Sequence, residues 1–133
     1  MASLSDVALD EGLTDACDVD LVHVAEVQRA RATQPSPEVL QRSAEILGLL
    51  ANPTRLAIVL ALAGEDGGPA PLLCVCDLAA IARARDSQTS HQLRALRLAG
   101  VVSQRRDGRL VYYRLAEDPL VRGVARALVG ARP

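Results

Sequence analysis

The sequence predicts a mainly α-helical fold with one two-stranded β-hairpin (α+β), in the order of a winged helix-turn-helix. Three observations predict it. Apolar residues recur at helical spacing over most of residues 37–128, and half of the chain is hydrophobic although only 2% is aromatic. Two short helical segments are separated by only residues 83–86, the length of the turn in a helix-turn-helix. Finally, Asp107-Gly108 separates two β-rich runs, which is a strong hairpin signal.

Residues 1–18 show no sustained periodicity and are expected to form a flexible acidic tail, followed by a folded domain over residues 19–133. A short helical stretch comes next, with helical spacing of Leu21, Val24 and Gln28. Ser36-Pro37 then predicts a helix start, because serine caps a helix N-terminus and proline fits the first helical position. This helix is expected to run to Leu50.

Asn52-Pro53 ends that helix and caps another, and the glycines and prolines of residues 64–71 predict an extended loop. Two helices over about residues 76–82 and 87–98 form the helix-turn-helix, with Asp86 or Ser87 as the cap of the second and Gly100 at its end. The hairpin follows. A last helix from about Asp118 carries an apolar stripe of Val121, Val124 and Leu128.

The net charge of -1 conceals an uneven distribution. Residues 1–28 contain seven acidic residues and no basic one, whereas residues 83–114 contain eight arginines against two aspartates. Such a basic segment favours a polyanionic partner, with a solvated charged face as the alternative. No apolar run is long enough to span a membrane and the acidic start lacks a signal-peptide pattern, so a cytoplasmic location with reduced thiols is expected.

The helix predicted over residues 87–98 has an apolar face and a polar face. Leu93, Leu96 and the aliphatic part of Thr89 are spaced to anchor it to the core. The polar face suits a DNA major groove, where glutamine pairs with adenine and arginine with guanine, and the arginines of the hairpin tip can reach phosphates or the adjoining minor groove. The predicted DNA-binding residues are Ser87, Gln88, Ser90, His91, Arg94, Arg105, Arg106 and Arg109.

These residues also have structural interpretations. His91 taken alone is more often a surface or core histidine, and the hairpin arginines could protect a strand edge from pairing with another chain. The combination of a basic two-stranded wing directly after a polar helix favours DNA binding over these alternatives.

Four motifs in this order resemble the ArsR/SmtB family of metal-sensing repressors. They are Leu50-Ala51-Asn52-Pro53-Thr54-Arg55-Leu56, Leu73-Cys74-Val75-Cys76-Asp77-Leu78-Ala79, Ser90-His91-Gln92-Leu93-Arg94-Ala95-Leu96 and Gly108-Arg109-Leu110-Val111-Tyr112-Tyr113. The resemblance covers about residues 37–128. It implies a homodimer, paired through the first and last core helices, that binds an inverted-repeat operator in double-stranded DNA and dissociates on binding metal.

The residues themselves argue against an enzyme. No Gly-rich phosphate loop is present, and a reactive thiol without an evident base is not a mechanism. Neither a membrane nor a small organic substrate is expected as a partner.

The three cysteines, Cys17, Cys74 and Cys76, are an odd number, which argues against a disulfide framework. Within a regular helix Cys74 and Cys76 would point about 200° apart, so both can face one ion only at a helix start or on extended backbone. Two thiolates do not complete a tetrahedral site, and the N-terminal part of the chain offers Cys17, Asp18 and His23. Two cysteines that act as small hydrophobic residues are the alternative.

By resemblance, the Cys-Val-Cys segment marks the branch of the family that includes cadmium, lead and zinc sensors. The resemblance implies that Cys17, Cys74, Cys76 and His23 coordinate the metal, with Asp18 a weaker candidate, and that the tail reaches the Cys-Val-Cys segment of the other subunit. A second metal site on the last helix is expected to be missing, because Glu117-Asp118-Pro119-Leu120 stands in its place and no histidine follows His91.

Thiolates with one imidazole suit Zn(II), Cd(II) or Pb(II) as the regulatory ligand. The alternative is an arsenite- or redox-responsive repressor that uses the same cysteines; arsenite would not need His23. A winged helix that binds protein rather than DNA is a further alternative, and it would show no salt-dependent binding to duplex DNA.

Overall fold

The computed structural model describes residues 23–65 and 68–130. The chain divides into two units, residues 1–36 and residues 37–133. In the first unit the structure describes α2 (Val24–Thr33), the short helix expected after the tail, and no residue of α2 is buried. The predicted tail of residues 1–18 and its boundary lie outside the described residues.

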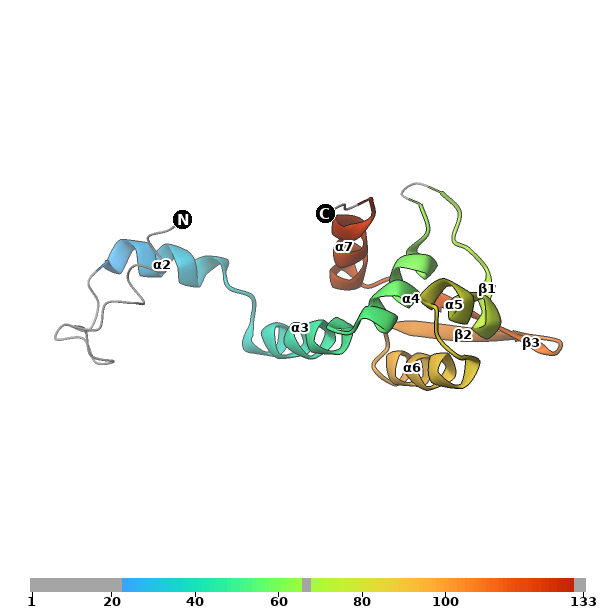
Figure 1. The fold of residues 1–133 in the computed structure, drawn as a ribbon. Coiled ribbons are helices and arrows are strands. Elements are labelled where there is room, and N and C mark those ends of the chain that lie inside the picture. Colours follow the sequence, from blue (N-terminus) through green and yellow to red (C-terminus); the bar gives the residue numbers. More distant parts are fainter. Residues whose placement is uncertain (1–22, 66–67, 131–133) are drawn as a thin grey trace. The chain divides into compact units, whose positions relative to one another are not determined.

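The second unit, which we call the winged domain, begins with α3 (Pro37–Leu50) and α4 (Pro53–Ala63). Their start signals act as predicted: Pro37 opens α3, and the side-chain oxygen of Asn52 accepts the backbone N–H of Arg55 at 3.1 Å. The chain bends by 104° between the two helices (Figure 1). Among the described helices none alone is long and apolar enough to cross a membrane, although this bent pair reaches the necessary length and composition together.

The predicted helix-turn-helix is formed by α5 (Val75–Ala82) and α6 (Asp86–Leu98). Gly100, with φ 78°, ends α6 as expected, because its N–H and that of Val101 donate to the carbonyls of Arg97 and Leu96. The predicted cap of α6 is wrong. The N-cap residue is Arg85, which makes no capping bond, and Asp86 already lies in the first turn.

The hairpin consists of β2 (Val102–Asp107) and β3 (Leu110–Leu115), joined by a two-residue turn in which Gly108 has φ 65°. We call residues 102–115 the wing. A third strand, β1 (Leu73–Cys74), pairs with β3 through Leu73↔Tyr113 and Cys74↔Tyr112, so the sheet has the order β1-β3-β2. The sequence predicts only two strands, because a two-residue strand is too short to show alternation.

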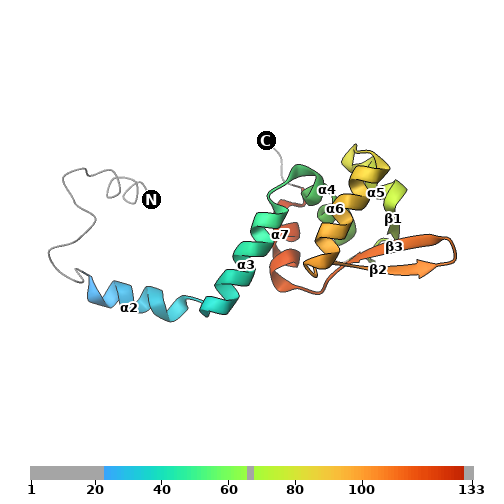
Figure 2. The ribbon, with the colours of Figure 1, turned by 90° about the horizontal axis from the view of Figure 1, so that it is seen from below.

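The core lies where α4, α5, α6, the sheet and α7 (Pro119–Leu128) meet (Figures 1 and 2). Asp118 caps α7 by accepting the N–H groups of Leu120 and Val121 at 2.9 and 3.3 Å. The predicted anchors of α6 are confirmed, since the residues with no exposed surface include Thr89, Leu93 and Leu96. This packing fixes which face of α6 points outward.

Candidate nucleic-acid interface and metal centre

The outward face of α6 is polar along its first two turns. Since Thr89, Leu93 and Leu96 are buried, the opposite face of α6 is directed to solvent. All five α6 residues predicted to read DNA are exposed: Ser87, Gln88, Ser90, His91 and Arg94. His91 is therefore a surface residue and not a core histidine. The face can donate and accept hydrogen bonds, as base edges require.

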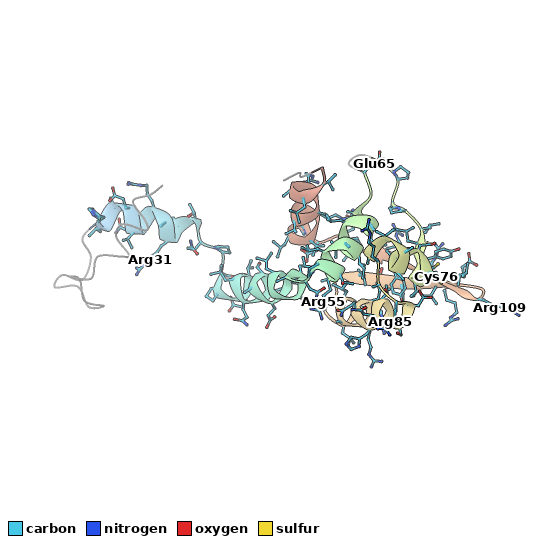
Figure 3. All side chains as sticks on the ribbon, viewed as in Figure 1. Arg31, Arg55, Glu65, Cys76, Arg85 and Arg109 are labelled. Carbon is cyan, nitrogen blue, oxygen red and sulfur yellow. The ribbon has the colours of Figure 1, made fainter. Side chains whose placement is uncertain are left out.

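The wing adds positive charge at its far end. Arg105 and Arg106 lie on β2 and Arg109 lies in the turn, where Figure 3 shows it at the tip of the hairpin. All three are exposed, and within the described residues none of them forms an ion pair. Because successive residues of a strand point to opposite faces, Arg105 and Arg106 project from opposite faces of β2.

The first turn of α6 and the tip of the wing lie toward the same side of the winged domain in both views (Figures 1 and 2). A polar helix and a basic hairpin that point the same way can engage neighbouring grooves of one duplex. The assignment of individual DNA contacts remains a prediction.

The two described cysteines lie at the start of α5, as the spacing argument required. Cys74 ends β1 and occupies the N-cap position with extended backbone angles (φ -98°, ψ -179°). Its thiol and its backbone N–H both donate to Oδ2 of Asp77, at 3.3 and 3.0 Å. Cys74 is half-buried and Cys76 is exposed, so neither is the buried hydrophobic residue of the alternative interpretation.

The thiol of Cys76 contacts α6. Its Sγ donates to Oδ2 of Asp86, the first residue of α6, at 3.4 Å. This hydrogen bond, with the negative charge of Asp86, raises the pKa of Cys76 above its usual range, because both stabilise the protonated thiol. The pKa of the Asp77 carboxyl is lowered instead, because the backbone N–H and the thiol of Cys74 both donate to its charged form.

The described residues include only part of the predicted ligand set. Within residues 23–65 and 68–130 no three histidine, cysteine or acidic side chains are arranged to hold one ion. His23 is exposed at the N-cap of α2, in the first unit, while Cys17 and Asp18 lie outside the described residues. Two thiols at one helix start fit a thiophilic ion chemically, provided that further ligands complete the shell.

Comparisons with known proteins place this arrangement in a family. Residues 52–104 match the family model described as bacterial regulatory protein, arsR family. The chain is also 43% identical over 102 residues to a transcriptional repressor SmtB homolog of Synechocystis, a match that spans 77% of this chain and 73% of the relative. The chain belongs to the ArsR family.

Further relatives agree with this ArsR-family assignment. A cadmium resistance transcriptional regulatory protein CadC homolog of Staphylococcus aureus is 35% identical and covers 89% of this chain and 93% of its own length. The homodimeric winged helix-turn-helix DNA-binding domain of Mb0332 from Mycobacterium bovis superposes with a TM-score of 0.58 at 30% identity, covering 74% of this chain and 87% of that domain. The predicted fold is confirmed, and the chain is a DNA-binding transcriptional regulator and not an enzyme.

Arg55, a half-buried residue of α4, has a role that the sequence did not predict. Its Nε donates to Oε1 of Gln92 at 2.6 Å, and its terminal nitrogen donates to the carbonyl of Leu49 at 3.1 Å. Arg55 therefore joins the end of α3 to the recognition helix α6, and it lies between these helices in Figure 3. Its position in the Asn-Pro-Thr-Arg motif was visible, but a partner 37 residues away was not.

Replacing Arg55 with alanine is expected to lower the free energy of unfolding by about 1–3 kcal/mol. The variant leaves the Gln92 amide oxygen and the Leu49 carbonyl without their donor in a half-buried place. Urea denaturation measures this loss, and Gln92→Ala, alone and combined with Arg55→Ala, completes a double-mutant cycle. Fully additive effects would show that the Arg55–Gln92 bond does not couple the two helices.

Proposed function

We propose that this ArsR-family protein is a cytoplasmic, metal-responsive repressor. As a homodimer it binds an inverted-repeat operator in double-stranded DNA, and it releases that DNA when a thiophilic divalent ion binds Cys74 and Cys76. The observation that carries this proposal is the contact between the Cys76 thiol and Asp86, because it joins the candidate metal site directly to the helix that would read DNA.

The DNA-binding half rests on the outward face of α6 and on the wing. Ser87 and the start of α6 serve a phosphate, while Gln88, Ser90, His91 and Arg94 meet base edges in the major groove. Of the wing residues, Arg109 and one of Arg105 and Arg106 meet phosphates or the minor groove, since the other strand arginine points away.

The homodimer rests on apolar surface that a single winged domain leaves uncovered. Along α3, Val39, Leu40 and Leu47 have 51%, 45% and 46% of their surface exposed. A groove between α3 and the start of α7 is lined by Ile46 and Leu120 among others, and its lining includes Arg42 and Asp118, which form an ion pair at 2.9 Å. Exposed apolar patches of this kind mark association surfaces, and the Mycobacterium bovis relative is described as homodimeric.

The metal half rests on the donor set. Cys74 and Cys76 supply two thiolates, and Cys17 with His23 completes the shell, with Asp18 as a weaker candidate; ligands from the partner's N-terminal segment would make the site inter-subunit. Thiolates with an imidazole suit Zn(II), Cd(II) or Pb(II). The name of the CadC relative, which refers to cadmium resistance, supports this class of ligand. When bound, the ion supplies a strong preference for the deprotonated thiols.

Loss of the thiol hydrogen of Cys76 is the step that links the two halves. A deprotonated Cys76 can no longer donate to Asp86, so the bond between α5 and the first turn of α6 is broken. The carboxylate of Asp86 would then lose the donor that holds it beside α5. Because α6 carries the reading face, its orientation or mobility changes and the operator is held less tightly.

The proposal is tested with the wild-type protein and a fluorescein-labelled duplex that it selects from a randomised pool. Zn(II), Cd(II), Pb(II) and arsenite are added in separate titrations, and release is followed by fluorescence anisotropy. We expect release by at least one divalent ion, and X-ray absorption of the loaded protein should show sulfur neighbours. Release by arsenite alone would support the alternative sensor, and a shell without sulfur would refute the site.

Asp86→Asn is expected to lower the pKa of Cys76, because it removes the charge that stabilises the protonated thiol. Cys76 is the one cysteine left in a Cys17→Ser, Cys74→Ser protein, so its alkylation rate can be followed against pH. Adding Asp86→Asn to this protein should shift the rise in alkylation rate to lower pH. With all cysteines intact, the variant should bind Zn(II) more tightly at neutral pH, since a metal ion competes with the thiol proton. Weaker binding would instead identify Asp86 as a ligand.

A further inference from the structure

The turn between α5 and α6 holds an arginine in a backbone conformation that favours glycine. Arg83 has φ 56° and ψ 45°, and among the described residues it is the one non-glycine residue with positive φ. The conformation is imposed by two bonds that end α5: the N–H of Arg83 donates to the carbonyl of Ala80 at 3.3 Å, and the N–H of Ala84 to that of Ala79 at 3.0 Å. Glycine is the usual residue here, because a Cβ is disfavoured in the left-handed region.

Arg85 occupies a second position that local physics disfavours. It is the N-cap residue of α6 and makes no capping bond. Serine, threonine, aspartate and asparagine are preferred at this position because they accept an N–H of the first turn. A positive charge also faces the positive end of the helix dipole. Both arginines of this short turn therefore lower the stability of the winged domain.

Within the part of the chain that the structure describes, no side-chain contact of either arginine offsets this loss of stability. Both are exposed, and no ion pair or side-chain hydrogen bond there involves either of them. Ala84, between them, is half-buried and holds the turn against the domain. Figure 3 labels Arg85 on the winged domain near α6. An arginine at a backbone position that suits glycine, with no side-chain contact in the described chain to offset the cost, is typical of a functional position.

We propose that Arg83 and Arg85 bind backbone phosphates of the DNA beside the groove that α6 enters. The inference rests on the proposed function. Both residues precede Ser87 by no more than four positions, so they lie at the end of α6 assigned to the duplex. The planar guanidinium matches a phosphate through two parallel hydrogen bonds. Such contacts set the register of the recognition helix on the duplex and carry no sequence information.

The test uses a double variant, Arg83→Gly with Arg85→Ser, in the full-length, metal-free protein. Both substitutions suit the local backbone, so the melting temperature should rise by about 3–8 °C. At the same time the slope of log K against log salt should fall by about 3.6, or 0.9 for each of four phosphate contacts in a dimer. The probe is the fluorescein-labelled duplex selected by the wild-type protein, titrated between about 50 and 200 mM NaCl.

Two controls separate phosphate binding from general charge. Arg83→Lys with Arg85→Lys keeps the positive charges and should keep most of the salt slope. Arg31→Gln removes one charge from α2, outside the winged domain, and should change the slope little. The inference is overturned if the double variant is stabilised but keeps the wild-type slope of log K against log salt. It is also overturned if Arg31→Gln lowers that slope as much, for each charge removed, as the double variant does. A wild-type protein without salt-dependent binding overturns the proposed function and this inference with it.

Discussion

Replacing Arg105, Arg106 and Arg109 together with alanine is expected to weaken binding to the selected duplex by about 100-fold or more at low salt. We expect one face of the wing to meet the duplex, so that two of the three arginines in each subunit contact it, because Arg105 and Arg106 point to opposite faces of β2. Four phosphate contacts are then lost from a dimer, and the slope of log K against log salt should fall by about 3.6.

The same geometry predicts that the three single alanine variants weaken DNA binding by unequal amounts. One of Arg105→Ala and Arg106→Ala should weaken binding nearly as much as Arg109→Ala, and the other should have almost no effect. The triple lysine variant is the matched control, since it preserves charge at all three positions. The wing arginines are exposed and make no ion pair in the described chain, so the melting temperature should stay within a few degrees of wild type. A triple alanine variant with an unchanged slope would leave the wing without a role in DNA binding.

Replacing Cys74 and Cys76 together with serine is expected to abolish the release of DNA by metal. An allosteric coupling of about 1–3 kcal/mol corresponds to a 5- to 150-fold loss of DNA affinity when wild type binds its ion. The double variant should show less than about a twofold change over the same metal concentrations. Anisotropy titrations with Cd(II), Zn(II) and Pb(II) measure both proteins directly.

Serine keeps the fold in this test. At position 74 it is a favourable N-cap residue, and its hydroxyl can replace the thiol in the bond to Asp77. At position 76 a hydroxyl can still donate to Asp86 and so retains the DNA-competent link. Two further single variants, His23→Ala and Cys17→Ser, should each weaken metal binding without changing the DNA affinity of the metal-free protein. If the Cys74, Cys76 variant releases DNA at the wild-type metal concentrations, the assigned ligands are wrong.

Local signals in the sequence predicted most of the fold. Proline and asparagine at the helix starts, Gly100 after α6 and Asp107-Gly108 in the hairpin each act through bonds to residues a few positions away, so their effect can be derived from spacing alone. The exposed face of α6 followed in the same way from the burial of Thr89 and Leu93.

Features that depend on distant partners were not predictable from spacing. The bond from Arg55 to Gln92 and that from Cys76 to Asp86 both join separate helices, and no local pattern encodes them. The cap of α6 was wrong for the same reason: Asp86 accepts from a thiol on α5 and not from its own helix. The opposite directions of Arg105 and Arg106 follow from strand alternation and could have been predicted from the sequence.

The short strand β1 connects Cys74 directly to the sheet that forms the wing. Cys74 is paired with Tyr112, and Arg109 lies three residues farther along the same hairpin, about 10 Å away at the usual rise of a strand. A tilt of about 6° of that ladder at Cys74 would shift the backbone at Arg109 by about 1 Å, which exceeds the usual range of hydrogen-bond lengths. A small rotation at Cys74 would therefore disturb the phosphate contacts proposed for Arg109 while the strands between remain paired.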